Sequence, residues 1–220
     1  MQIQVSAASK RFNKEWIFKN LNFQFEAGKH YALVGNNGSG KSTLLQIIAG
    51  YSGLTKGSIS WSPFDTINIY EQISFAAPYL ELVEEFTATE QFEFQAQFKP
   101  IQKDLSTEKI LELIGLKNAA HKQIRYYSSG MKQRLKLALA IFSDCPILLL
   151  DEPCSNLDKE GMETYQMLIK DYAMHKLIIV ASNDPQEYHF CDQQLALTDF
   201  KKLSSEITHP KPPDEKNSKR

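Results

Sequence analysis

One glycine-rich segment carries the clearest chemical signal in the chain. Gly35–Thr43 reads GNNGSGKST and matches the pattern G-x-x-x-x-G-K-[ST], with a short apolar run before it and a helix-like pattern after it. Glycines in such a loop let backbone N–H groups turn towards a phosphate, and the start of the following helix adds partial positive charge. The phosphate-binding residues expected here are Gly35, Asn36, Asn37, Gly38, Ser39, Gly40, Lys41, Ser42 and Thr43.

Two side chains of this loop have more specific roles in phosphate chemistry. Lys41 can reach the β- and γ-phosphates of a nucleotide, and the Ser42 hydroxyl can bind Mg²⁺. The loop leaves the reaction open, because kinases, GTPases, helicases and transport ATPases all use it. The alternative interpretation is a glycine turn that precedes a helix by chance.

A second chemical signal is the segment Ile147–Pro153, which reads ILLLDEP and ends an aliphatic run on two adjacent carboxylates. Ligands of open α/β sheets bind at the carboxyl ends of the parallel strands. Asp151 is therefore expected to hold the Mg²⁺ shell together with Ser42. Glu152 would accept a proton from, or orient, the water that attacks the γ-phosphate. The alternative is an ordinary strand end with solvated acids.

Apolar patterning predicts the elements that position these residues. Continuous apolar runs at Tyr31–Val34, Ile147–Leu150 and Leu177–Ala181 suit parallel strands that are buried on both faces. Other segments show alternation or helical spacing. They predict strands at Gln2–Ala7, Leu21–Phe25, Ser58–Trp61 and Ile67–Tyr70, helices at Ser42–Ala49 and Met131–Phe142, and an inserted helical segment at Thr87–Leu116.

Length and composition fit a single α/β domain, or a core with a small subdomain. The 220 residues include 25 basic and 26 acidic residues, and 42% are apolar. This balance gives no argument for binding nucleic acid or an anionic membrane surface. We find no apolar run of membrane-spanning length and no signal-peptide core, which favours a cytoplasmic protein with reduced cysteines. The tail from His209 is rich in proline and charge and is expected to be disordered.

The segment Tyr126–Leu135, YYSSGMKQRL, lies between the two motifs, and Ser155–Asp158, SNLD, follows them. This order resembles an ATP-binding cassette (ABC) ATPase over roughly residues 1–200. The family pattern LSGGQ corresponds to Tyr127–Met131, where the first, third and fifth positions differ. Ser128 and Gly130 match the positions that face the γ-phosphate in the family.

The resemblance also suggests other nucleotide contacts. Asp158 corresponds to the end of the family's D-loop. Phe12 occupies the place of an aromatic residue that stacks on adenine, with Trp16 as a less suitable candidate and a core role as the alternative for Phe12.

The family further implies a fold, cofactors and partners. The fold would be α/β, a P-loop NTPase with a RecA-like parallel-sheet core, an antiparallel β subdomain and an inserted helical subdomain. We expect the ATPase domain at residues 1–205, its helical subdomain at about 79–143 and a disordered tail at 206–220. The cofactors would be ATP and Mg²⁺. The partners would be a second cassette, expected to be an identical copy, and a separate permease, with the chain on the inner face of the membrane.

Two positions depart from the family pattern. Pro78 stands where resembling cassettes carry a glutamine, and Gln72 comes too early to replace it. Asn183 stands where they carry a histidine after the strand Leu177–Ala181, and His189 is expected to be a surface or packing residue. Asn183 can donate a hydrogen bond to a γ-phosphate but cannot carry a proton or a charge. Hydrolysis of ATP is therefore expected to be active but slow.

Three functions are compatible with these motifs. The leading one is the ATP-hydrolysing subunit of an ABC transporter, driven by ATP-dependent dimerisation. The alternative is an ATP-gated clamp or regulator that has no permease, although such proteins usually carry two cassettes or a long coiled-coil insertion. A small-molecule kinase is a third possibility, and SSGMKQR and SNLD argue against it.

Overall fold

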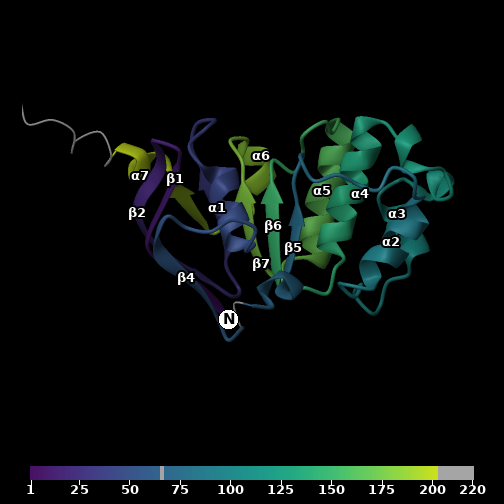
Figure 1. Ribbon diagram of the computed structural model, residues 1–220. Helices are drawn as coiled ribbons and strands as arrows, with labels where there is room; N and C mark the ends of the chain where they lie inside the picture. The colour runs from purple at the N-terminus through teal and green to yellow at the C-terminus, as the bar shows by residue number, and fades with distance from the viewer. Residues whose placement is uncertain (65–66, 203–220) are drawn as a thin grey trace, which may run out of the picture.

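The computed structural model describes residues 1–64 and 67–202, and the predicted disordered tail lies outside this range. An antiparallel sheet forms one end of the molecule, a parallel sheet lies in the middle, and a group of helices forms the other end (Figure 1). In this view the strand β6 points towards the edge of the parallel sheet at which the candidate site lies.

The antiparallel sheet has the strand order β2-β1-β4. Alternate residues of its central strand, such as Ile3 and Val5, are buried, as expected for a sheet with one face against a core. The bounds are β1 Gln2–Phe12, β2 Glu15–Glu26 and β4 Lys56–Ser62. The strands predicted at the N-terminus are therefore confirmed and are longer than predicted.

The parallel sheet has the strand order β5-β6-β7-β3-β8. In β6, Ile147 and Leu149 pack into one hydrophobic cluster. Leu148 and Leu150 pack into a second cluster on the opposite face, so this strand is buried on both sides as its continuous apolar run predicted. The bounds are β3 His30–Val34, β5 Ile73–Ala76, β6 Ile147–Asp151, β7 Leu177–Ala181 and β8 Gln193–Ala196.

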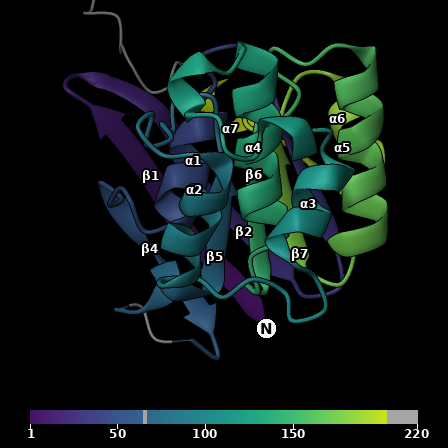
Figure 2. The ribbon, with the colours of Figure 1, turned by 90° about the vertical axis from the view of Figure 1, so that its right-hand side faces the viewer.

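Three helices form the far end of the molecule and lie together in the side view (Figure 2). They are α2 Ala88–Ala96, α3 Thr107–Leu113 and α4 Ser129–Ile141. Thr87 and Glu90 form a reciprocal capping box at the start of α2. The remaining α-helices are α1 Lys41–Ile48, α5 Lys159–Tyr172, α6 Pro185–Tyr188 and α7 Thr198–Lys202. Within residues 1–64 and 67–202, no helix combines the length and apolar character needed to cross a bilayer.

One predicted strand is wrong. Instead of a strand at Ile67–Tyr70, the chain forms a turn and then a short 3₁₀ helix, η1, at Ile69–Gln72, and the strand β5 begins only at Ile73. Ile67 and Tyr70 are exposed, whereas Ile73 is buried and pairs with Ile147 of β6. Pairing with the core strand β6 starts at Ile73 and therefore decides where β5 begins.

Candidate functional site

The glycine-rich loop connects β3 to α1 at the carboxyl end of the parallel sheet. Gly40 has a φ of 100°, and a Cβ at this position would stand 2.3 Å from Cγ2 of Ile17 on β2. The loop can therefore approach β2 this closely only with glycine here. No side chain caps α1 and its first turn has no acidic residue, so the N–H groups of that turn remain suited to a phosphate.

The Lys41 side chain is folded back over the loop. It donates hydrogen bonds to the carbonyl oxygen of Gly35 at 2.7 Å and to Oδ1 of Asn183 at 3.2 Å. The residue is only 6% exposed, and burial lowers the pKa of its ammonium group, while Glu152 and Asp151 act in the opposite direction. The lysine is thus placed between the loop and the carboxylates of Asp151, the predicted metal ligand, and Glu152, the predicted catalytic base.

Asn183 follows β7 and lies against the phosphate loop. Besides accepting from Lys41, its amide donates to Oδ1 of Asn37 at 3.0 Å. Asn183 stands where the family pattern has a histidine. Its side-chain amide therefore lies at the loop and contacts the side chains of Lys41 and Asn37. His189 is exposed, and its Nδ1 lies 3.1 Å from the carbonyl oxygen of Gln186.

Asp151 occupies the end of β6, where it pairs with Ala181 of β7. It is 2% exposed, and neither carboxylate oxygen has a hydrogen-bond partner of normal geometry. Burial raises its pKa, whereas the neighbouring hydroxyls of Ser42 and Tyr79 lower it. A buried carboxylate without a partner is costly, and a bound cation would remove this cost.

These groups fit Mg²⁺. This ion prefers oxygen ligands, and it often uses one or two carboxylates while nucleotide phosphates and waters fill its remaining positions. Asp151 and the Ser42 hydroxyl supply such oxygens beside the phosphate loop. Over the part of the chain that the structure describes, no group of three or more His, Cys, Asp or Glu residues could hold a metal by itself. The donor set therefore suits a cation that arrives with a nucleotide.

Glu152 has a backbone conformation that non-glycine residues rarely adopt. Its φ is 44°, and its N–H donates to the carbonyl oxygen of Ala181 at 2.9 Å. Such outliers cluster at functional sites, where surrounding contacts hold them in place. The residue is exposed, so water can reach its carboxylate. The structure thus brings Glu152, Asp151 and Lys41 together at one edge of the sheet.

The segment Tyr127–Met131, which corresponds to the family pattern LSGGQ, lies at the start of α4 and apart from the phosphate loop. Figure 1 shows α1 and α4 on opposite sides of β6. Ser128 is the N-cap of α4 and accepts from the N–H of Met131 at 3.2 Å. Asp158 is the N-cap of α5 and accepts from the N–H of Gly161 at 2.8 Å. Within one copy, Ser128, Gly130 and Asp158 are therefore not brought together with the loop.

Phe12 ends β1 and is 48% exposed, which rules out the core role that was the alternative for it. The Lys10 ammonium lies 4.8 Å from the centre of its ring. Trp16 has a different setting, because Arg11 and Lys19 lie over its ring at 5.3 and 4.9 Å. Its ring is thus in contact with two cations, and Phe12 remains the more accessible aromatic surface.

Sequence reasoning missed Tyr79. Its hydroxyl lies beside the Asp151 carboxylate and the side chain of Gln46 on α1. The only signal in the sequence is its place immediately after Pro78, at the end of the segment that leaves β5. The carbonyl oxygen of Pro78 accepts a hydrogen bond of 2.8 Å from the Lys136 side chain on α4.

Comparison with known proteins decides the family. The family described as "ABC transporter" matches residues 18–155, which is more than half of the chain. The chain belongs to the ABC transporter ATP-binding protein family. Its members hydrolyse ATP, so this chain is an ABC ATPase, and the predicted family and fold class are confirmed.

Two relatives from Bacillus subtilis (strain 168) illustrate the similarity of this ABC ATPase to curated proteins. It is 29% identical to the uncharacterized ABC transporter ATP-binding protein YybJ, over 93% of this chain and 96% of YybJ. It is 32% identical to the uncharacterized ABC transporter ATP-binding protein YxlF, over 87% of this chain and 66% of YxlF. Both relatives are thus named as the ATP-binding proteins of transporters.

Solved structures share the fold. One is an ATP-binding cassette whose structure is a dimer in a post-hydrolysis state with ADP and inorganic phosphate bound. It superposes with a TM-score of 0.76 at 24% identity, covering 88% of this chain and 93% of that chain. The five-stranded parallel sheet and the three-stranded antiparallel sheet of this ABC ATPase therefore form a known cassette architecture.

Proposed function

We propose that this ABC ATPase hydrolyses ATP with Mg²⁺ between two copies of itself and thereby powers a separate membrane permease. The observation that carries the proposal is the position of Asp151. It is a buried carboxylate that has no hydrogen-bond partner of normal geometry and lies beside Ser42 and Lys41. Such a carboxylate suits a cation that enters with a nucleotide. The chain would act on the inner face of the membrane, and nucleic acid has no role in it.

The roles of the residues follow from their positions. The loop Gly35–Thr43 would bind the phosphates through its N–H groups and Lys41, and Phe12 would stack on the adenine. Mg²⁺, when bound by Ser42 and Asp151, would neutralise charge on the β- and γ-phosphates. Glu152 would accept the proton of the attacking water, which forms the new bond to the γ-phosphorus while the bond to ADP breaks.

A second copy would complete the site. The helix α4, which Ser128 caps, lies on the other side of β6 from α1 (Figure 1), so Ser128 and Gly130 suit the γ-phosphate of a nucleotide bound to a partner copy. Asp158 would lie at the same contact between copies. The helices α2, α3 and α4 would belong to the inserted helical subdomain of about residues 79–143, within an ATPase domain of residues 1–205.

Hydrolysis by the isolated chain should be slow. Asn183 contacts Lys41 and Asn37 but offers a neutral amide where a histidine could become charged, so it gives weaker electrostatic help at the transition state. A permease would be needed to raise the rate.

The proposal is tested with the purified chain and its Glu152→Gln variant. We expect slow ATP hydrolysis by the wild type, and a stable dimer in the presence of ATP and Mg²⁺ only in the variant, which retains its ATP. Glu93→Gln, an exposed position on α2, is the matched control and should behave as the wild type. Absence of both hydrolysis and dimer in every protein would contradict the proposal.

A further inference from the structure

Tyr79 is the first residue with a polar side chain after the strand β5. The strand ends at Ala76, and Ala77 and Pro78 lead to it. The residue is 47% exposed, and its hydroxyl lies beside the Asp151 carboxylate and the side chain of Gln46. One end of this side chain therefore reaches the candidate cation site while the residue as a whole stays partly open to solvent.

The polar neighbours of Asp151 approach it from two sides. Ser42 and Lys41 belong to α1, which follows β3. In the sheet, β7 lies between β3 and β6. Tyr79 follows β5, which borders β6 on its other side. Tyr79 thus brings a hydroxyl to the β5 side of a buried carboxylate whose two oxygens have no hydrogen-bond partner of normal geometry.

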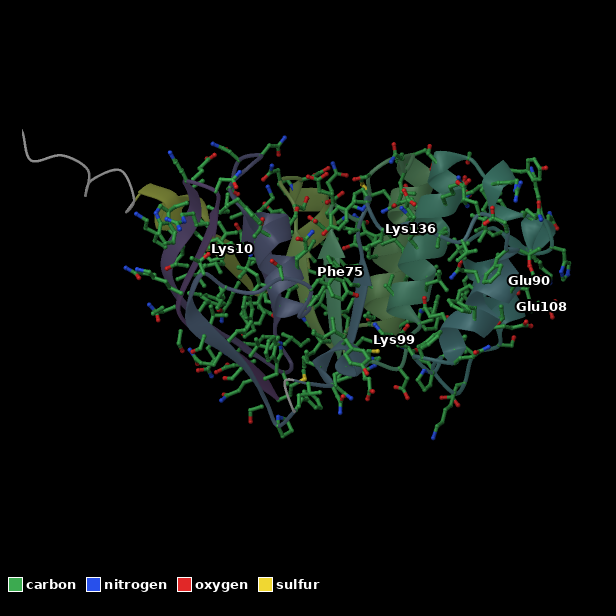
Figure 3. All side chains as sticks on the ribbon, in the orientation of Figure 1. Lys10, Phe75, Glu90, Lys99, Glu108 and Lys136 are labelled. Carbon is green, nitrogen blue, oxygen red and sulfur yellow. The ribbon has the colours of Figure 1, made fainter. Side chains whose placement is uncertain are left out.

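The Tyr79 ring packs against a second aromatic residue, Phe75. Its ring meets that of Phe75 edge to face, with the centroids 6.3 Å apart and the planes at 78°. The centroid of the Phe75 ring is in turn 5.9 Å from that of the Tyr51 ring. Figure 3 shows Phe75 between Lys136 and Lys99, where β5 meets the helices. Edge-to-face contacts of this kind favour one ring orientation, which supports the position of the hydroxyl beside Asp151.

We propose that Tyr79 is a positioning residue for the divalent cation that accompanies the nucleotide, and that its hydroxyl completes the set of oxygen groups around Asp151 from the β5 side. The proposal rests on the proposed function, which supplies the cation and the nucleotide. A phenol both donates and accepts hydrogen bonds while neutral. Burial raises the pKa of Tyr79 to about 12, so the hydroxyl keeps its proton near neutral pH and the role requires no change of charge.

The test compares nucleotide binding with and without the cation. The affinity of the purified chain for a fluorescent, non-hydrolysable ATP analogue is measured in Mg²⁺ and in EDTA. Tyr79→Phe removes only the hydroxyl. Tyr51→Phe is the matched control, because it removes a hydroxyl from the other ring that contacts Phe75. Circular dichroism checks that each variant is folded.

We expect Tyr79→Phe to weaken binding by about five- to tenfold in Mg²⁺, the effect of losing one hydrogen bond that the hydroxyl would make at the cation site once the cation is bound, and to leave binding in EDTA unchanged. Tyr51→Phe should match the wild type in both solutions. Equal weakening with and without Mg²⁺, or no weakening, would overturn the role of Tyr79 while leaving the proposed function intact. A wild type that binds no nucleotide in either solution would instead refute the proposed function, and the role of Tyr79 with it.

Discussion

The Lys136 ammonium donates a hydrogen bond of 2.8 Å to the carbonyl oxygen of Pro78, and so connects the segment after β5 to the helix α4. Burial lowers the pKa of Lys136, while Glu81 acts against this effect. Because the acceptor is a backbone oxygen, the contact does not depend on the side chain at position 78. This hydrogen bond links the segment that leads to the nucleotide site with the helix α4, although the chain has proline and not glutamine at position 78.

Replacing Lys136 with methionine should destabilise the protein. The change keeps the aliphatic stem but leaves the Pro78 carbonyl without its donor, which should lower the free energy of unfolding by about 1–2 kcal/mol. Lys132→Met is the control, since Lys132 lies one turn earlier on α4 and pairs with the exposed Glu84, a contact that contributes less than about 1 kcal/mol. Urea denaturation measures both variants, and equal effects would argue against the contact with Pro78.

The Asn183→His variant should hydrolyse ATP faster than the wild type. Asn183 lies 3.2 Å from Nζ of Lys41 through a neutral amide, and a histidine could carry a proton and a charge at the same place. We expect a rise of about tenfold or more in kcat, the range of one electrostatic contact at a transition state. Steady-state ATPase assays measure it. If the wild type turns over as fast as the variant, the neutral amide does not limit the rate.

Gly40→Ala should impair the phosphate loop far more than Gly38→Ala. Both glycines have a positive φ, which costs an alanine about 1–2 kcal/mol. At Gly38 a Cβ would meet nothing within 4 Å, whereas at Gly40 it would stand 2.3 Å from Cγ2 of Ile17. Nucleotide affinity and thermal unfolding report both effects. The double variant of Gly40→Ala with Ile17→Ala should recover part of the loss, and no recovery would exclude the clash as its cause.

The sequence was sufficient to place the strands that carry the site. Tyr31–Val34, Ile147–Leu150 and Leu177–Ala181 match β3, β6 and β7 within one residue, because strands buried on both faces leave an unbroken apolar run. Parallel strands also share a carboxyl edge. For that reason Asp151 and the phosphate loop could be expected at one place.

Other features depend on contacts between distant segments. The start of β5 is set by pairing with β6, which the apolar residues before it do not reveal. Lys136 and Pro78 are 58 positions apart, so their contact follows from how α4 packs against β5. The position of the Tyr79 hydroxyl likewise depends on a ring contact with Phe75 and on the nearness of β5 to β6. No local pattern encodes these relations.

Lys176 should make stability depend on pH in alkaline solution. It is 1% exposed and donates to the carbonyl oxygens of Ile141 and Ser143, and burial lowers its pKa from 10.5 to about 8. Between these two pH values the unfolded chain holds a proton that the folded chain has released. The free energy of unfolding should therefore rise with pH in this window, by up to about 1.4 kcal/mol per unit, and this contribution is lost as pH falls through 8.

Lys176→Met separates this effect from the titration of other groups. Urea denaturation at several pH values from 8 to 10.5 should give a shallower rise for the variant than for the wild type. If the free energy of unfolding rises equally steeply with pH in both proteins, Lys176 is not the cause of the pH dependence.

The absence of a side chain at Gly130 affects how this ABC ATPase can meet its neighbour. A Cβ at Gly130 would stand 3.2 Å from the carbonyl oxygen of Asn156, so the first turn of α4 and the loop after β6 already meet with little room between them. These two segments therefore form one continuous surface. Under the proposed function this surface would meet a partner copy, so a side chain added at position 130 would disturb both segments of that contact at once.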